Sequence, residues 1–382
     1  MFVEFRYKFK KNPLYAKKHI HLQPQIQTFD ILTHSFIRIL ILFVVSFSLL
    51  IACRGEGSGS KRPPQCDNIP MEEGEEQTDN IHIKEEPETV EETGYLQRLS
   101  HIANGDTTGL WPVDDQPLPL KGAVLPYNRV VAYYGNLYSK NMGILGKYPP
   151  KEVWQQLNEE VDAWESADPD TPVRPAIHYI AVVAQGSPWS DGKYRYRMPE
   201  AQIDSALAIA EMGDALLFLD IQVALSTVEE EVPLLERYLK MPHVHLGIDP
   251  EFSMKDGTPP GKKIGTYDAG DINFCTEYLA KLVRKHGLPP KMLIVHRFTR
   301  GMVTHYRDII LRPEVQIVIN MDGWGGPQLK YDTYRQYVYK EPVQFAGFKL
   351  FYDNDVKRPP HRMLTPAEIL KLQPHPVYIQ YQ

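Results

Sequence analysis

Two acidic side chains stand close together where the apolar stretch HVHLGIDPEFSM, residues 243–254, turns polar. Successive side chains of a strand point to opposite faces, so Asp249 and Glu251 would lie on the same face. Carboxyl groups that crowd together in a partly enclosed space repel each other, so one keeps its proton near neutral pH while another stays ionised. A protonated acid beside an ionised carboxylate is what hydrolysis of a glycosidic bond requires. We therefore predict that Glu251, which has the longer side chain, donates the proton and that Asp249 is an ionised partner.

Two further aspartates follow the same alternation in other apolar segments of the chain. Asp322 is a second candidate for the ionised partner, and Asp220 could orient the pair or tune its protonation. Polar and aromatic side chains near other segment ends could hold a carbohydrate or another small polar ligand, the aromatic ones by stacking on sugar rings: Tyr134, His296, Trp324, Lys349, Tyr352, Asp353 and Gln380. The structural alternative is that an aspartate after a strand caps the following turn. Capping explains several acids in the same phase less well than a shared site does.

The order of apolar segments predicts the elements that would bring these residues together. Eight strand-like runs alternate with helix-like stretches, at residues 129–135, 176–184, 215–222, 243–251, 291–298, 315–324, 345–353 and 376–382. This alternation is typical of parallel βα units, and eight units predict an α/β protein with a (β/α)8 barrel of the TIM type. An open, doubly wound sheet is the alternative, but the turn after the first strand, YYGNLYSKNMG, lacks the GxGxxG pattern. In a barrel, the polar strand ends would meet at the carboxyl-terminal rim, where barrel enzymes have their active sites.

Helical periodicity is clear in four of the intervening stretches: residues 150–167, 199–213, 226–240 and 271–287. In the last of them, Phe274, Tyr278 and Leu282 share a face, and Gly287 is placed to end the helix. No helix-like stretch follows the eighth strand in this sequence. We expect the lead-in GYLQRLSHIANG, residues 94–105, to supply that helix from the other end of the chain.

The beginning of the chain has the pattern of a secretory signal. Basic residues precede an apolar run from Ile39 to Cys53, which is shorter than the roughly 20 residues that a membrane-spanning helix needs. Its end, LIAC at residues 50–53, resembles the lipobox of bacterial lipoproteins, in which the cysteine becomes the lipidated first residue. The resemblance implies a signal peptide at residues 1–52, a membrane anchor on Cys53, and a body in the bacterial cell envelope, outside the cytoplasm. An uncleaved anchor is the alternative.

Residues 53–94 form the predicted link between the anchor and the body. This segment is rich in Gly, Ser and Pro and then in Glu, with almost no apolar side chains, which is typical of a disordered tether. Residues 95–382 would then form one barrel domain. The chain has 382 residues and a net charge of −6, with scattered Lys and Arg, so we expect no nucleic-acid partner. Cys66 and Cys275 indicate neither a disulfide framework nor a metal-binding CxxC pair.

The acidic pair also carries a resemblance to known enzymes. An Asp-x-Glu sequence at the end of the fourth strand of a barrel is similar to that of chitinase-type and lysozyme-type glycoside hydrolases, in which the glutamate is the acid. The resemblance implies that role for Glu251, with Asp249 beside it. The sequence departs from the chitinase motif at residues 246–248, Leu-Gly-Ile, where that motif has further acids. Residues 127–382 also resemble uncharacterised bacterial lipoproteins, which agrees with the predicted compartment.

Two other functions stay open. A metal-dependent hydrolase could draw its ligands from a set of histidines and one acid: His178, His243, His245, His296 and Asp322. His243 precedes Asp249 by six residues, which at about 3.3 Å per residue places it about 20 Å away, toward the opposite end of the barrel. We therefore expect no metal and no other cofactor. The second alternative is a non-catalytic surface module that holds a glycan or another ligand. Acyl transfer and nucleotide chemistry are disfavoured, because the sequence has no serine nucleophile elbow, Walker loop or Rossmann fingerprint.

Overall fold

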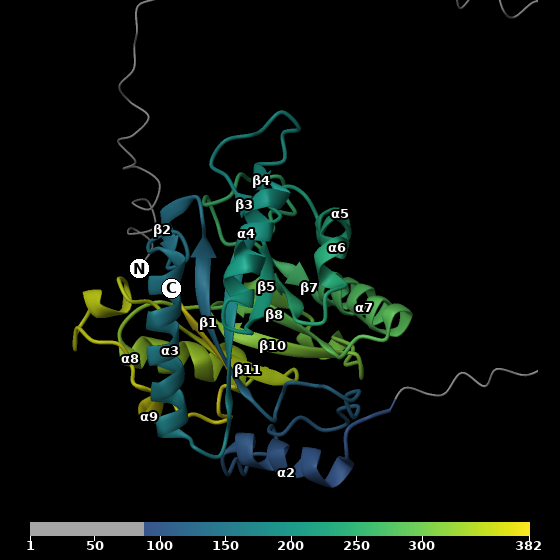
Figure 1. Ribbon diagram of the computed structural model, residues 1–382, viewed down its shortest axis with the longest axis vertical. Coiled ribbons are helices and arrows are strands. Elements are labelled where there is room, and N and C mark those ends of the chain that lie inside the picture. The colour runs from purple at the N-terminus through teal and green to yellow at the C-terminus, as the bar shows by residue number, and fades with distance from the viewer. Residues whose placement is uncertain (1–87) are drawn as a thin grey trace, which may run out of the picture. The chain divides into compact units, whose positions relative to one another are not determined.

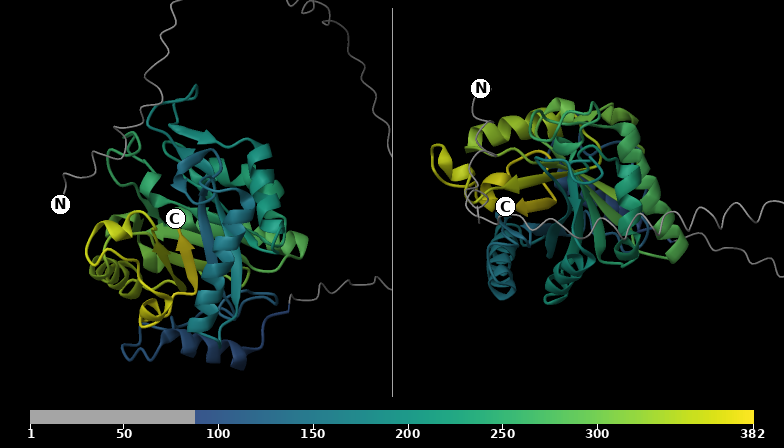
Figure 2. Two further views of the ribbon diagram at one scale, coloured as in Figure 1. Left: turned by 60° about the vertical axis from the view of Figure 1, so that its left-hand side comes forward. Right: turned by 90° about the horizontal axis from the view of Figure 1, so that it is seen from above.

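The structure, a computed structural model, describes residues 88–382 (Figure 1, Figure 2). The chain divides into two units, Met1–Lys84 and Glu85–Gln382, and the described residues belong to the second. The predicted signal peptide, Cys53 and most of the predicted tether lie outside the described residues. Contacts of the body begin ahead of Tyr95, because the backbone N–H of Val90 donates a hydrogen bond of 3.0 Å to the carbonyl oxygen of Pro119.

Eight parallel strands close into a barrel, which confirms the predicted (β/α)8 fold. Their order around the barrel follows the chain: β1 (Arg129–Asn136), β3 (Val173–Ala184), β5 (Leu216–Ile221), β6 (Val244–Ile248), β8 (Lys291–Arg297), β10 (Val315–Met321), β11 (Phe345–Leu350) and β12 (Tyr378–Tyr381). The ring closes because β12 pairs in parallel with β1, with Val130 opposite Tyr378. Each predicted strand segment corresponds to one of these strands, with differences at the ends.

The strand that precedes the acidic pair is shorter than predicted. β6 ends at Ile248, and we expected it to continue to Glu251. Pro250 has no backbone N–H to offer a neighbouring strand, and the side chain of Asp249 accepts a hydrogen bond from the backbone N–H of Glu251. The chain therefore leaves the sheet and forms the 3₁₀ turn η4 (Pro250–Phe252).

Helices pack on the outside of the barrel. They are α3 (Pro150–Ala167), α4 (Glu200–Glu211), α5 (Val228–Glu231), η3 (Val232–Leu235), α6 (Glu236–Leu239), α7 (Ala269–His286), α8 (Pro327–Tyr334), η7 (Arg335–Tyr339) and α9 (Pro366–Ile369). Their buried side chains, such as Trp164, form one apolar cluster with outward-facing strand side chains. The helix predicted at residues 226–240 is divided into short turns, because Pro233 cannot donate the hydrogen bond that would continue α5. α7 begins with a capping box at Asp268 and ends at Gly287, whose φ is 60°.

The lead-in segment forms α2 (Glu92–Ala103), which covers the amino-terminal end of the barrel (Figure 1). We expected this helix among the outer helices, after the eighth strand. Its buried side chains instead share a core with inward-facing apolar side chains of the strands, such as Phe218 and Ile294. The members contributed by the helix are Tyr95, Leu99 and Ile102. The helix lies there because the amino-terminal half of the barrel interior is apolar and must be covered from water.

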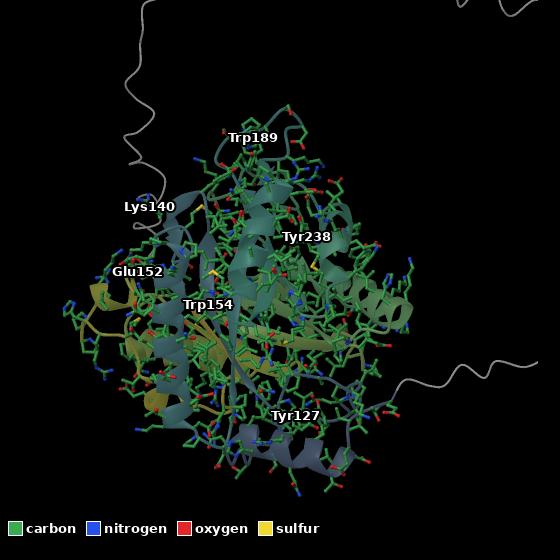
Figure 3. All side chains as sticks on the ribbon, in the orientation of Figure 1. Tyr127, Lys140, Glu152, Trp154, Trp189 and Tyr238 are labelled. Atoms are coloured by element: carbon green, nitrogen blue, oxygen red, sulfur yellow. The ribbon has the colours of Figure 1, made fainter. Side chains whose placement is uncertain are left out.

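Short elements extend the opposite, carboxyl-terminal end of the barrel. β2 (Ser139–Gly143) pairs with β1 and β4 (Arg195–Arg197) pairs with β3, both antiparallel. The parallel strands β7 (Tyr267–Asp268) and β9 (Val303–Thr304) form a separate two-stranded sheet. The loop between β3 and β4 carries Trp189 at the end of the body opposite α2 (Figure 3). Across residues 88–382, no helix combines the length and the apolar character needed to cross a bilayer.

Candidate active site

The carboxyl-terminal half of the barrel interior is lined by polar and ionisable side chains that are buried or nearly so. All eight barrel strands contribute, either from within the strand or from the residue after it: Tyr134, His178, Asp220, Asp249, His296, Asn320, Asp322, Lys349, Tyr378 and Gln380. They point inward because alternate residues of each strand face the barrel axis. We call these ten residues the buried cluster. It unites the predicted residues Tyr134, Asp220, Asp249, His296, Asp322, Lys349 and Gln380.

Asp220, on β5, has no exposed surface and lies at the centre of the buried cluster. Its Oδ2 accepts a hydrogen bond of 3.0 Å from the Tyr134 hydroxyl. Its Oδ1 lies 3.5 Å from Nε2 of His178 and 3.5 Å from Nε2 of His296. Burial opposes ionisation of Asp220, but the adjacent His296 and His178 outweigh burial and hold its pKa below the usual range. Asp220 is therefore an ionised carboxylate between two imidazoles.

His296 links two carboxylates across the barrel. Its Nδ1 lies 3.1 Å from Oδ2 of Asp322, and the other oxygen of Asp322 lies 3.1 Å from Nζ of Lys349. Burial disfavours the charged imidazole, but Asp220 and Asp322 together raise the pKa of His296 to about 10. Burial likewise disfavours the charged form of Asp322, but Lys349 and His296 lower its pKa to about 2. The Lys349 ammonium also lies 3.8 Å from the centre of the Tyr134 ring, so each buried charge has a partner.

Asp249 combines a structural role with an unusual protonation state. Its Oδ1 accepts a hydrogen bond of 3.0 Å from the backbone N–H of Glu251, and its Oδ2 accepts one of 3.2 Å from Gln222 Nε2. Burial raises the pKa of Asp249 to about 8, and the nearby carboxylates, Glu251 first among them, favour the proton further. The capping role weighed from the sequence is therefore present. The same side chain is also a protonated acid at neutral pH, a role that we expected for Glu251.

His178, on β3, is held by two residues of β12. Its Nδ1 lies 2.5 Å from the Tyr378 hydroxyl and 3.0 Å from Gln380 Nε2, which also donates to that hydroxyl. Burial lowers the pKa of His178 to about 4, so the ring is neutral near pH 7. From the sequence, His178 appeared only as a possible metal ligand, and Tyr378 was placed on the inward face but was not among the predicted site residues. The available signal was their phase, because both residues lie on the inward face of predicted strands.

Besides Glu251, three predicted site residues lie outside the buried cluster. The Tyr352 hydroxyl lies 2.9 Å from that of Tyr133 and donates a hydrogen bond of 2.5 Å to Glu160 of α3, so Tyr352 packs between the barrel and its outer helices. Asp353 is exposed, with its carboxylate 3.3 Å from Lys147 Nζ. Trp324 is 37% exposed beyond the end of β10.

Two other predicted residues differ from expectation in their surroundings. Glu251 is half-buried at the rim, beside Asp249 and not among the fully buried acids. Tyr134 points inward as predicted, but its ring is buried beneath the Lys349 ammonium and offers no face to a sugar. The exposed aromatic side chains of the rim are Tyr138, Trp189 and Trp324.

The HxH pair of β6 does not join the buried cluster. The ring of His245 packs against Phe218 in the apolar part of the interior, and its Nδ1 accepts a hydrogen bond of 3.1 Å from the backbone N–H of Met292. Burial lowers the pKa of His245 well below its usual value. Among the described residues, the only buried group of histidines and acids placed to share one ion is His178, Asp220 and His296.

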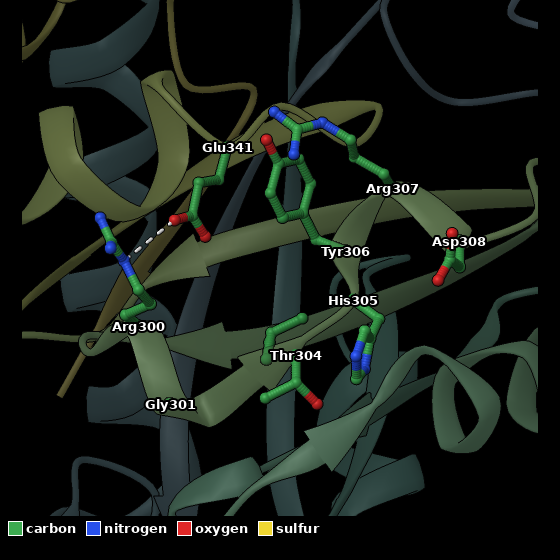
Figure 4. Close-up of a pocket in the computed structure, with 9 residues that line it drawn as sticks. Arg300, Gly301, Thr304, His305, Tyr306, Arg307, Asp308 and Glu341 are labelled. Atoms are coloured by element: carbon green, nitrogen blue, oxygen red, sulfur yellow. Dashed lines mark ion pairs between the residues drawn. The ribbon is translucent and has the colours of Figure 1, made fainter.

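A surface pocket with a volume of about 480 Å³ lies on the connection between β8 and β10 (Figure 4). An ion pair of 3.3 Å between Arg300 Nε and Glu341 spans it. The remaining lining residues are Gly301, Val303, Thr304, His305, Tyr306, Arg307 and Asp308. None of the residues that line this pocket belongs to the buried cluster. The pocket and the residues with unusual protonation states therefore lie in different parts of the protein.

No protein-family model and no curated protein matches this chain. The chemistry of the site is therefore given by its own side chains. These are a protonated Asp249 and the ionised Asp220 and Asp322, gathered at the carboxyl-terminal end of a (β/α)8 barrel.

Proposed function

We propose that the protein is a hydrolase of the bacterial cell envelope whose barrel cleaves a glycan. The observation that carries the proposal is the protonation pattern of three buried carboxyl groups. Asp249 keeps its proton at neutral pH, while Asp220 and Asp322 are ionised. Residues that hold different protonation states in one enclosed place are candidates for acid and base roles.

In this proposal Asp249 is the proton donor. A glycosidic bond breaks when an acid gives its proton to the leaving oxygen while a carboxylate stabilises the positive charge that develops on the sugar ring. Asp322 is the less deeply buried of the two ionised acids, with a side chain that is 9% exposed, and so it is the carboxylate nearer to an entering ligand. Asp220, with no exposed surface, is a positioning residue that fixes His296 and Tyr134.

Exposed aromatic side chains at the same end of the barrel support a sugar ligand. Tyr138, Trp189 and Trp324 are the exposed large aromatics among the described residues, and they follow β1, β3 and β10. Trp189 is 49% exposed and packs against Tyr196, with 4.9 Å between ring centres. Aromatic rings offer a flat apolar surface that suits the apolar face of a pyranose. Figure 3 shows Trp189 at the tip of its loop.

The envelope location rests on the lipobox-like sequence at residues 50–53, which lies outside the described residues. A lipid on Cys53 would attach the protein to a membrane and leave the body outside the cytoplasm. The glycans of that compartment would then be within reach of the barrel.

The proposal is tested with Asp249→Asn, assayed against a panel of β-linked polysaccharides. Asparagine caps a turn about as well as aspartate but has no proton to give, so hydrolysis should fall by about 10²- to 10⁴-fold. The variant loses at most the hydrogen bond from Gln222, about 1 kcal/mol of unfolding free energy.

Asp268→Asn is the matched control, because Asp268 caps α7 with the same side-chain geometry and lies outside the buried cluster. It should keep full activity. Equal turnover by wild type and Asp249→Asn would exclude Asp249 as the acid. Retention of a glycan without any turnover by the wild type would make the barrel a binding module.

A further inference from the structure

We propose that His178, Asp220 and His296 form a binding site for a divalent transition metal ion, with Zn²⁺ as the best-fitting ion. One nitrogen or oxygen of each residue lies within 4.8 Å of those of the other two. The inference concerns the same site as the proposed function, but it is tested by binding alone, so either proposal can fail without the other. It revises the expectation from sequence, which included no metal.

The spacing of the three atoms suits a tetrahedral ion. Oδ1 of Asp220 lies 3.5 Å from Nε2 of each histidine. Ligands about 2.0–2.1 Å from Zn²⁺ in a tetrahedron are separated by roughly 3.3 Å, which is close to these two distances. All three ligand atoms lie within 4.8 Å of one another. Two histidines and one carboxylate also form a known type of Zn²⁺ site, in which the fourth position stays open.

The three atoms lie beside one another but make no well-aligned hydrogen bond. Nε2 of His178, Oδ1 of Asp220 and Nε2 of His296 are buried and have no aligned hydrogen bond among the described residues. Buried polar atoms without a partner are uncommon, because burial removes their hydrogen bonds to water. Three such atoms that face one another, from β3, β5 and β8, indicate a cation as the common partner.

Each candidate ligand is oriented by a second residue on its far side. The Tyr378 hydroxyl lies 2.5 Å from Nδ1 of His178, and Oδ2 of Asp322 lies 3.1 Å from Nδ1 of His296. The Tyr134 hydroxyl donates to Oδ2 of Asp220, which leaves Oδ1 for the ion. Metal-binding histidines commonly have such a carboxylate or hydroxyl on the nitrogen that does not bind the metal.

Gly247 of β6 allows two of the candidate ligands, Asp220 and His178, to lie close to its backbone. A Cβ atom on Gly247 of β6 would lie 2.6 Å from both Oδ1 of Asp220 and Nε2 of His178. Real Cβ atoms essentially never make contacts this short, so alanine at this position would displace at least one of these two ligand atoms.

The positive charges near the site leave room for an ion. Apart from His296 itself, the cationic side chain of the buried cluster is Lys349, whose ammonium is paired with Asp322 and lies over the Tyr134 ring. His296 must give up a proton to bind a metal, because histidine binds metals as the neutral imidazole. Without an ion, the same cluster would hold His296 as an imidazolium between two carboxylates, and this is the competing state.

A second group of two histidines and one acid, His101, Asp168 and His375, serves as an internal control. Nη2 of Arg129 lies 2.9 Å from Oδ2 of Asp168, so a cation already occupies that carboxylate. His101 is exposed on α2. We therefore assign no metal to this group.

The test uses the full chain without a polyhistidine tag, stripped with a chelator and dialysed. Zn²⁺ is titrated by calorimetry, and Co²⁺ is added as a probe whose visible absorption reports tetrahedral coordination. We expect about one ion per chain. His178→Ala and Gly247→Ala should each weaken Zn²⁺ binding by at least about 100-fold, and Tyr378→Phe by about 10- to 100-fold.

The control His101→Ala should bind Zn²⁺ like the wild type, and a melting curve of each variant shows whether it folds. Because Gly247→Ala keeps all three ligands, its loss of binding would depend on their spacing. Absence of Zn²⁺ and Co²⁺ binding by the stripped wild type would overturn the proposal. Binding that is lost in His101→Ala but kept in both His178→Ala and Gly247→Ala would overturn it as well.

Discussion

Oδ1 of Asp249 accepts a hydrogen bond of 3.0 Å from the backbone N–H of Glu251, so the two neighbouring acids have different structural roles. Asp249 closes the turn after β6 and is 2% exposed, whereas Glu251 sits half-buried at the rim. Burial and nearby carboxylates keep the proton on Asp249. This difference can be measured without knowledge of the ligand.

Stability of the metal-free protein should decrease between about pH 4 and pH 8 because of Asp249. An unfolded chain loses the proton of an aspartate near pH 3.9, but the folded protein keeps that of Asp249 up to a pKa of about 8. The folded state therefore holds the extra proton in this range, and its advantage is fully present below about pH 4 and lost as the pH passes about 8. Relative to Asp249→Asn, the wild type should lose a few kcal/mol of unfolding free energy, at up to about 1.4 kcal/mol per pH unit.

Denaturant unfolding at a series of pH values measures this difference. Glu251, Asp220, Asp322, His296 and Lys349 are present in both proteins, so the difference between the two curves reports the proton of Asp249 together with its effect on these neighbours. Parallel stability curves for the two proteins would show that Asp249 is already ionised in the folded state.

Asp355→Asn should destabilise the protein by about 3–5 kcal/mol. Asp355 and Lys330 form a fully buried ion pair, with 3.0 Å between Oδ2 and Nζ. Burial already lowers the pKa of Lys330 to about 8, and the variant would leave its ammonium without a carboxylate. The side chain of Asp355 also accepts hydrogen bonds from the backbone N–H groups of Gly325 and Phe351.

The control for that substitution is Asp353→Asn, two residues earlier. Asp353 is exposed, and its pairing with Lys147 at 3.3 Å is a surface contact. We expect no measurable change in melting temperature. Equal effects of the two substitutions would show that the buried pair contributes no more than a surface pair.

Leu99→Ala should cost about 2–5 kcal/mol of unfolding free energy. Leu99 of α2 is 3% exposed and packs in the core that closes the amino-terminal end of the barrel. Leu96 lies one turn earlier on the same helix and is 53% exposed, so Leu96→Ala should change stability by less than about 0.5 kcal/mol. Chemical denaturation of both variants is the measurement, and similar small losses would mean that α2 is not part of the cooperative core.

Cys53→Ser should release the protein from membranes, if Cys53 carries a lipid. Cys66→Ser, which removes another cysteine of the same segment, should leave fractionation unchanged. The measurement is separation of membrane and soluble fractions, with the size of the mature chain determined by mass spectrometry. A Cys53→Ser protein that stays in the membrane fraction at its original size would support an uncleaved anchor.

The barrel could be predicted from the sequence because each of its strands is a compact apolar run. Alternation within these runs also places Asp220, His296, Lys349 and Gln380 correctly in the interior. Both signals follow from a barrel whose strands are covered by helices outside and filled with side chains inside.

The placements that alternation predicts wrongly lie beyond the ends of the strands. β11 stops at Leu350, so alternation no longer places Asp353, and Tyr352 shares the outward phase of Leu350. Trp324 follows the end of β10 at Met321 in the same way. Period-2 alternation is a property of extended backbone and carries no information about the loop beyond it.

The protonation states could not be predicted from the sequence either. They depend on which groups meet from distant strands, such as His296 with Asp220 and Asp322. The same holds for the close approach of His178 of β3 and Asp220 of β5 to Gly247. A sequence gives the chemical types of these residues, but the distances between them come from the closed ring.

Because α2 covers the amino-terminal end of the barrel, the interior can be reached only from the carboxyl-terminal end. The apolar amino-terminal half excludes water and α2 covers it, so a polymer cannot thread through the barrel. A ligand of the buried cluster must arrive over the rim and leave by the same route. Product and incoming ligand would then pass the same carboxyl-terminal rim, so the product must leave before the next ligand can bind.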